Sequence, residues 1–343
     1  MTRIYIFILL FFFLFSNSIT AQEKDTPRTG EGIHAFLRRN KRTTSGDYNK
    51  FLLLNKDKFG KNNSLLKGIS YQLPPLPAEN KKPVTPPKVS DVSSKAETYK
   101  KKTNRLFGKK YEEYPIVSDR LRGACFYLSS GHGGPDSGAV GKIDGHEVHE
   151  DEYAYDITLR LARNLLMEGA TVYVIIQDAK DGIRDDTYLA NSKSEMCMGK
   201  AIPLNQVARL KQRSSKINEL YKKSGEKYKR AVFIHLDSRS KKSQLDVFFY
   251  YAPKSIVGER LANSMRNTFR EHYAKHQPNR GFSGTVSSRS LYVLTNTTPV
   301  GIFAELGNIQ NSFDQRRFLQ SDNRQALANW MCRGFIKDYE NSK

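Results

Sequence analysis

Polar side chains follow three apolar runs that the sequence predicts to be strands. His132 comes just after the run 124–128, His235 lies near the end of the run 231–236, and Glu305 lies in the run 300–306. Ligands of open α/β sheets bind outside the carboxyl ends of the strands, so we expect these three side chains to lie close together. A fourth residue, Glu150, stands immediately before a long predicted helix, where a carboxylate faces the positive end of the helix dipole.

Two imidazoles and one carboxylate form a common catalytic zinc set, in which the fourth position stays open for water. Zinc lowers the pKa of its bound water toward about 7. The remaining carboxylate would then act as a general base and accept the proton of that water while the hydroxide attacks a carbonyl group. These four residues therefore predict a metal-dependent hydrolase.

Each of these residues also has a structural explanation. A histidine at a strand end is often a packed, hydrogen-bonded residue, and Glu150 is an ordinary charge for a helix start. His146 and His149 lie close to it in sequence and compete with the other imidazoles as ligands. The glycines of Gly131–Gly134 favour the metal interpretation, because they let the backbone approach an imidazole closely. Glu305 is the hardest to explain structurally, because an unpaired carboxylate is costly to bury.

The elements that must position these residues alternate between strand-like and helix-like runs. Strands are predicted at 124–128, 171–176, 231–236, 245–251, 291–294 and 300–306, and helices at 153–168, 207–221, 256–272 and 324–339. Alternation with continuous apolar strands indicates an α/β fold, with a mostly parallel central sheet covered by helices on both faces.

Length leaves room for a second module beside this domain, and the N-terminal residues predict export. The chain has 343 residues, enough for one full domain and a smaller module, and its mean hydropathy is −0.61. Arg3, a short apolar run over 4–15 and a small residue at Ala21 predict a signal peptide over residues 1–21. We expect the periplasm as the destination, with secretion or the cell surface as alternatives. The three cysteines are too few and too widely spaced for a disulfide framework or a metal cluster.

The net charge of +21 indicates an anionic partner. More than half of it lies before residue 121, in linker and surface segments. Export and the absence of a clustered basic and aromatic face argue against nucleic acid as that partner.

A small α+β module is predicted over residues 28–74, followed by a Pro/Lys-rich linker over 75–113 and the catalytic domain over 114–343. The module contains Gly30–Gly32, a Phe-x-x-x-Asn helix at Phe51–Asn55 and the ending Leu65–Pro74. It resembles LysM, a peptidoglycan-binding module; a generic basic α+β segment is the alternative.

The catalytic domain resembles the zinc-dependent N-acetylmuramoyl-L-alanine amidases of the bacterial cell wall, of the amidase_3 type. The matching stretches, in chain order, are Ser130–Ala139, His149-Glu150, Asp156-Ile157, Gly169–Val172, Arg213, Phe233–His235, Leu291–Leu294, Pro299-Val300 and Glu305–Gly307.

This resemblance implies one zinc ion per chain, held by His132, Glu150 and His235, with Glu305 as catalytic acid/base. The implied reaction hydrolyses the amide between the lactyl group of N-acetylmuramic acid and L-alanine in peptidoglycan. Arg213 and Asp237 are candidates for substrate contact or for support of the ligands. The family usually has Asn at the position of Asp237, and often Arg at the position of Thr295. A non-catalytic peptidoglycan-binding protein is the alternative function.

The stretch 178–202 is longer than the family pattern requires. In some of these amidases an inserted helix covers the zinc until a partner releases it. We therefore predict a lid or a docking segment for an activator protein here, with a passive surface loop as the alternative.

Overall fold

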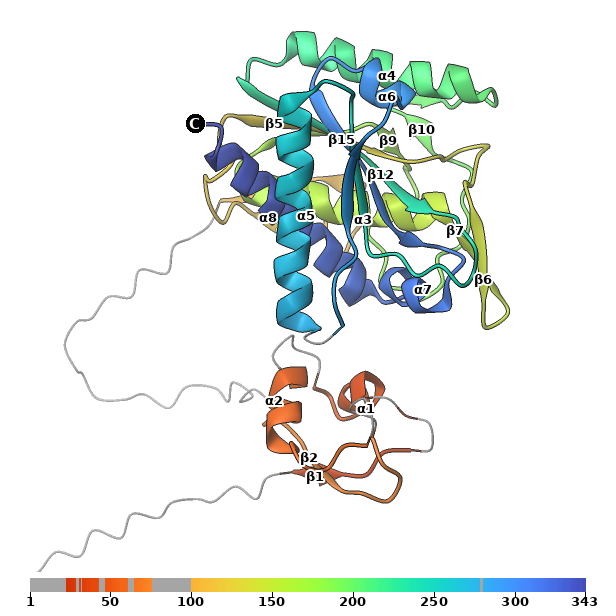
Figure 1. The fold of residues 1–343 in the computed structure, drawn as a ribbon, viewed down its shortest axis with the longest axis vertical. Helices are drawn as coiled ribbons and strands as arrows, with labels where there is room; N and C mark the ends of the chain where they lie inside the picture. Colours follow the sequence, from red (N-terminus) through yellow and green to blue (C-terminus); the bar gives the residue numbers. More distant parts are fainter. Residues whose placement is uncertain are drawn as a thin grey trace, which may run out of the picture. The chain divides into compact units, whose positions relative to one another are not determined.

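The computed structural model describes residues 23–28, 31, 33–42, 47–60, 65–75, 100–277 and 280–343. The chain divides into two compact units, residues 1–93 and 94–343 (Figure 1). The predicted signal peptide, the glycines of Gly30–Gly32 and most of the predicted linker lie outside the described residues. Among the described helices, none combines the length and apolar character needed to span a membrane.

The first unit is a small α+β module. Strand β1 (Lys24–Asp25) pairs antiparallel with β2 (Tyr71–Gln72), and helices α1 (Ile33–Arg39) and α2 (Asp47–Leu54) lie between them in sequence. Its apolar core consists of Ile33, Phe36, Leu37, Phe51, Tyr71 and Leu73. Asn55 joins the end of α2 to β2, because its side chain exchanges two hydrogen bonds with the backbone of Gln72. We expected the module to begin at residue 28, but its first strand lies before that position. Nothing in the sequence indicated this strand, because its two polar residues carry no hydrophobic pattern.

The second unit is built on a six-stranded sheet in the order β14-β13-β15-β12-β5-β8. The strands are β5 (Ala124–Ser130), β8 (Thr171–Val174), β12 (Tyr228–Asp237), β13 (Phe248–Tyr251), β14 (Thr285–Ser288) and β15 (Val300–Asn308). Only the β13–β15 pair is antiparallel among these described strands. The predicted mostly parallel sheet is confirmed.

Helices cover both faces of the sheet (Figure 1). Helices α3 (Glu150–Met167), α5 (Ile256–His276) and α8 (Ser321–Glu340) share one core with Phe126 and Leu128 of β5. Helices α4 (Gln206–Lys223) and α6 (Tyr292–Thr295) share a second core with Cys125 and Tyr127. Alternate residues of one strand thus face opposite helical layers.

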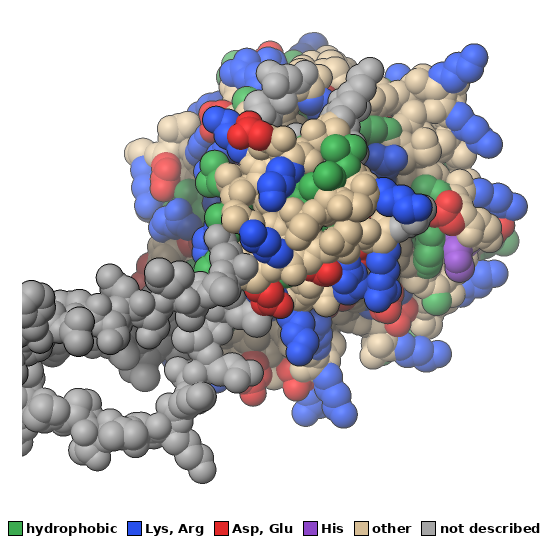
Figure 2. Space-filling view, turned by 90° about the horizontal axis from the view of Figure 1, so that it is seen from below, with side chains coloured by type: hydrophobic (Ala, Val, Ile, Leu, Met, Phe, Trp, Pro, Cys, Tyr) green, Lys and Arg blue, Asp and Glu red, His purple; other side chains and the backbone are tan. Residues whose placement is uncertain are grey.

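Smaller elements complete the unit. They are β3 (Lys101–Thr103), the 3₁₀ turn η2 (Arg105–Phe107), β4 (Glu113–Pro115), β6 (Val140–Ile143), β7 (His146–His149), β9 (Ile176–Gln177), β10 (Met196–Cys197), β11 (Lys200–Ala201) and α7 (Ser312–Leu319). Figure 2 shows Lys and Arg spread over the visible face of the molecule, with Asp and Glu between them.

Two predicted elements are wrong. Residues 291–294 do not form a strand, since α6 begins at Tyr292; four apolar residues have no period that separates a strand from a helical turn. The linker does not extend to residue 113, because β3 pairs with β4 and Phe107 is fully buried in the core of the second unit. The lysines of β3 point to solvent, so its composition resembles that of a linker.

A buried ionic network fixes α3 to α8. The carboxylate of Asp156 accepts hydrogen bonds from Arg160 Nε at 2.8 Å and from Arg324 Nε at 2.6 Å. Asp156 and Arg324 are both fully buried.

We expect Asp156→Ala to lower the free energy of unfolding by about 3–5 kcal/mol, because two buried guanidinium groups lose their common partner. Urea unfolding followed by circular dichroism measures this. The control is Asp119→Ala, which removes an exposed ion pair with Arg122 and should cost less than about 1 kcal/mol. Equal losses in the two variants would contradict a structural role for the network.

Candidate metal centre

The structure brings His132, Glu150 and His235 together at the carboxyl edge of the sheet. His132 follows β5, Glu150 is the first residue of α3, and His235 lies near the end of β12. One possible ligand atom from each residue lies within 4.8 Å of the other two. Glu150 Oε1 is 3.2 Å from His132 Nε2 and 2.9 Å from His235 Nδ1. The side chains predicted from strand ends therefore converge on one point.

Glycines make room for these ligands. A Cβ at Gly131 would lie 2.3 Å from the His235 imidazole, and that imidazole stacks on Phe303 at 4.2 Å between ring centres. A Cβ at Gly138 would lie 2.7 Å from both Glu150 Oε2 and His132 Cδ2, and its φ of +67° also favours glycine. Two glycines of the Ser130–Ala139 stretch are thus explained by contact with the ligand side chains.

The His132 ring is oriented by a carboxylate on its other side. His132 Nδ1 lies 2.9 Å from Asp136 Oδ2, which also accepts a hydrogen bond from Arg209 of α4 at 2.5 Å. The hydrogen bond to His132 lowers the pKa of Asp136 to about 2. Burial opposes the charged imidazole, but hydrogen bonds to Asp136 and Glu150 outweigh it and raise the pKa of His132 to about 10. The two carboxylates therefore stabilise positive charge at the His132 ring, whether a proton supplies it or a metal ion on the Glu150 side.

Arg213 supports the loop that carries His132. Its guanidinium is buried and donates hydrogen bonds to the backbone carbonyl oxygens of Ser130, at 3.2 Å, and of His132. Asp237 accepts hydrogen bonds from Arg239 and from its neighbour's backbone. Asp136 and Arg209 were missed as functional residues, although Arg209 lies four residues before Arg213 on the same helix and so shares its face.

Glu305 lies beside His235. The two residues are register partners in the parallel strands β15 and β12, so their side chains leave the same face of the sheet. Glu305 Oε2 is buried and has no hydrogen-bond partner among the described residues. Burial, followed by the charges of Glu150 and Asp237, raises the pKa of Glu305 well above its usual value. A carboxylate with a raised pKa accepts a proton more readily than an ordinary glutamate does.

The competing histidines lie elsewhere. His146 and His149 belong to β7 of a hairpin with β6; His146 stacks on Tyr188, and His149 Nδ1 lies 3.0 Å from the Asn191 amide. Neither belongs to a group of potential metal ligands in the described part of the chain.

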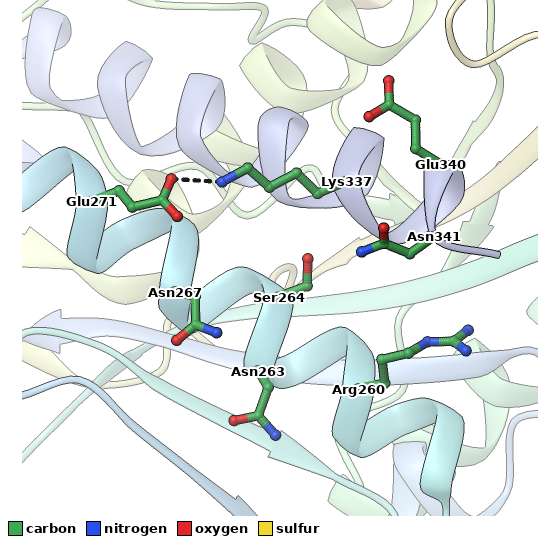
Figure 3. A pocket seen from close by; sticks show the side chains of 8 residues that line it. All are labelled: Arg260, Asn263, Ser264, Asn267, Glu271, Lys337, Glu340 and Asn341. Atoms are coloured by element: carbon green, nitrogen blue, oxygen red, sulfur yellow. Dashed lines mark hydrogen bonds and ion pairs between the residues drawn. The ribbon is translucent and has the colours of Figure 1, made fainter.

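A polar groove between α5 and α8 is separate from these residues (Figure 3). It is lined by Arg260, Asn263, Ser264, Asn267, Glu271, Lys337, Glu340 and Asn341, and Lys337 spans it to Glu271. None of the predicted site residues lies in it, so it does not change the location of the candidate centre.

The segment 178–202, for which we predicted a lid or a docking segment, packs into the domain through part of its length. Its side chains Ile183, Leu189 and Cys197 are buried in the two cores, and β10 pairs with β9. One of its contacts near the candidate centre is a hydrogen bond from the Gly134 backbone to Glu195 at 2.8 Å. The segment is therefore an integral part of the domain, held by apolar contacts as well as by polar ones.

Three solved structures to which this chain is similar are described as amidases. The chain resembles N-acetylmuramoyl-L-alanine amidase AmiC2 of Nostoc punctiforme (20% identity, TM-score 0.45) and the catalytic domain of the amidase CwlV from Bacillus (Paenibacillus) polymyxa var. colistinus (22%, 0.46). It also resembles the CwlD amidase of Clostridioides difficile, solved in complex with the GerS lipoprotein (18%, 0.47). Each match covers 64% of this chain and 99% of the other. A comparison with curated proteins found no match.

The family is established by sequence. The profile of the Amidase_3 family, described as N-acetylmuramoyl-L-alanine amidase, matches residues 127–337. This range is well over half of the chain and includes His132, Glu150, His235 and Glu305. The chain belongs to the N-acetylmuramoyl-L-alanine amidase family, whose substrate is the peptidoglycan of the cell wall.

Proposed function

We propose that His132, Glu150 and His235 hold one zinc ion and that Glu305 is the catalytic acid/base of this amidase. The bond cleaved is the amide between the lactyl group of N-acetylmuramic acid and L-alanine of the stem peptide. The observation that carries the proposal is the convergence of two imidazole nitrogens and one carboxylate oxygen within 4.8 Å, with Glu305 paired in register to His235.

The donor set fits zinc. Two histidines and one glutamate are a usual ligand set of catalytic zinc sites, and the space that Gly131 leaves beside the His235 ring lets that ligand reach the others. Zinc at such a site acts as a Lewis acid and lowers the pKa of the water bound to it. Asp136 and Arg209 keep His132 oriented, and Arg213 fixes the loop on which it stands.

Glu305 is the group that accepts and donates the proton. Its carboxylate takes a proton from the attacking water and later delivers it to the nitrogen of the leaving L-alanine. The raised pKa of Glu305 supports the first step, since burial and neighbouring charges favour the protonated form that results from it.

Asp136→Asn is expected to weaken zinc binding by about 10–100-fold, because the amide no longer accepts a charge-assisted hydrogen bond from His132 Nδ1. Competition with a chromogenic chelator measures the affinity. Lys142→Ala, on the exposed hairpin, should leave the affinity unchanged. Wild-type zinc affinity in Asp136→Asn would remove Asp136 from this role.

The ligand assignment is tested by metal analysis of the purified protein. We expect one zinc per chain in the wild type and none retained after dialysis in His235→Ala. His146→Ala, which removes an imidazole outside the centre, should retain its zinc. Loss of zinc in His146→Ala but not in His235→Ala would overturn the assignment.

We also propose that the small module with β1, α1, α2 and β2 is a LysM-like peptidoglycan-binding module. Its α+β order supports this, as does Asn55, which joins α2 to the closing strand. The inactive Glu305→Gln chain should sediment with purified sacculi, and the same chain without residues 23–75 should stay largely in the supernatant. Equal sedimentation would show that the catalytic domain alone binds the wall.

A cell-wall amidase acts outside the cytoplasm, and we propose the periplasm as its site, on the basis of the predicted signal peptide.

We further propose that an activator protein docks on the segment 178–202, where Met196 is an exposed apolar side chain. Met196→Glu should then lower wall cleavage in cells while the purified variant keeps wild-type activity; unchanged cleavage in cells would contradict docking there.

A further inference from the structure

A second cluster of acidic side chains lies in the core of the catalytic domain. Asp151 and Glu152 stand in the first turn of α3, and Glu195 comes from the segment just before β10. All three are at least 96% buried, with exposed fractions of 2%, 1% and 4%. One carboxylate oxygen from each lies within 4.8 Å of the other two.

The protein supplies too little positive charge for this cluster. Arg184 forms an ion pair with Glu152 at 2.8 Å, and it is the only Lys or Arg paired with any of the three among the described residues. Glu195 accepts a hydrogen bond from the Gly134 backbone, and burial raises its pKa to about 7. Ionisation of all three carboxylates beside one guanidinium would therefore leave an uncompensated negative charge, which is costly in a protein interior unless a cation binds.

One oxygen of the cluster lacks any partner. Asp151 Oδ1 accepts a hydrogen bond from the Glu152 backbone, but Asp151 Oδ2 is buried and has no hydrogen-bond partner in the described parts of the chain. Buried polar atoms are nearly always satisfied, so an orphaned carboxylate oxygen beside two other carboxylates points to a missing positive ligand.

We propose that Asp151, Glu152 and Glu195 bind a second cation, Ca²⁺. Calcium takes carboxylate oxygens at about 2.3–2.6 Å, so oxygens across the ion lie up to about 5 Å apart, which agrees with the spacing of the cluster. An all-oxygen set disfavours zinc, which prefers imidazole and thiolate ligands. Mg²⁺ requires a tighter octahedron and retains several waters, for which this buried position is less suited.

The position of the cluster gives the cation a structural task. Asp151 follows Glu150 directly, and Glu195 receives the hydrogen bond of Gly134, two residues after His132. A cation between them would clamp the segment 178–202 to the start of α3 and to the His132 loop. Calcium would therefore stabilise the fold and this segment without entering the reaction, and this inference does not depend on the zinc assignment.

The test uses the full-length protein, stripped of metals and reloaded with one equivalent of zinc. Equilibrium dialysis with radioactive Ca²⁺ gives the stoichiometry and affinity, and thermal melting with added CaCl₂ or MgCl₂ gives the stabilisation. We expect one Ca²⁺ per chain and a melting temperature that rises with CaCl₂. Glu195→Gln and Asp151→Asn should weaken calcium binding at least tenfold and keep one zinc, whereas the exposed Asp119→Asn should behave as wild type.

Several results would overturn the proposal. One is the absence of calcium binding by wild type up to about 10 mM, above the weakest affinity of extracellular calcium modules; protons would then neutralise the cluster. Another is wild-type calcium affinity in folded Glu195→Gln and Asp151→Asn. Stabilisation by MgCl₂ but not by CaCl₂ would contradict the assignment of calcium to this site. If a variant does not fold, the stoichiometry and the melting curves of the wild type still show whether the protein binds calcium.

Discussion

Glu305→Gln is expected to lower the rate of stem-peptide release by about 10²–10⁴-fold, the range lost when a general acid/base is removed. The amide cannot accept the proton of the attacking water or return it to the leaving nitrogen. Glutamine has nearly the same size as glutamate, and Glu305 Oε2 makes no hydrogen bond with the described residues that the change could break, so the fold should keep its stability. Chromatography of peptides released from purified sacculi measures the rate.

The matched control is Asp237→Asn, which neutralises a neighbouring carboxylate that lies in β12 and bonds to Arg239. We expect it to lower the rate much less than Glu305→Gln does. Circular dichroism and zinc content must match the wild type in both variants. Wild-type peptide release by folded, zinc-loaded Glu305→Gln would falsify the role of Glu305.

Gly131→Ala is expected to reduce both zinc affinity and peptide release by more than about 100-fold. The added Cβ would lie 2.3–2.7 Å from three atoms of the His235 ring, which also stacks on Phe303. The imidazole must therefore leave its position, and small misplacements of a catalytic group carry such rate losses.

Gly225→Ala provides the matched control, since a Cβ there meets nothing within 4 Å. It should keep zinc and activity. Chelator competition and sacculus digestion on both variants give the comparison. A Gly131→Ala protein with wild-type zinc affinity would show that His235 is not held as a ligand at this position.

Much of the sheet could be predicted from the sequence, because its central strands are continuous apolar runs. The rule that polar residues after parallel strands meet at one edge also predicted that His132, His235 and Glu305 lie close together, as they do in the structure. The strand predicted at 291–294 was wrong because its length permits either structure. The β6–β7 hairpin was missed because its residues alternate only weakly between apolar and polar.

Contacts between distant segments could not be predicted. Arg209 reaches Asp136 across 73 residues, and Glu195 approaches Asp151 only when the segment 178–202 packs on α3. That segment looked like an insertion in sequence because its charged residues, such as Arg184, are typical of surfaces. In the fold these charges pair with buried partners such as Glu152. Hydrophobic periodicity carries no information about such pairs.

We propose that this chain is a zinc-dependent amidase acting on peptidoglycan. Mass spectrometry of the products from purified sacculi tests it most directly, with untreated, chelator-treated and zinc-restored enzyme. We expect free stem peptides that begin with alanine, which disappear with the chelator and return with zinc. Products cleaved in the glycan chain or within the peptide, or free stem peptides that persist after zinc removal, would contradict this function.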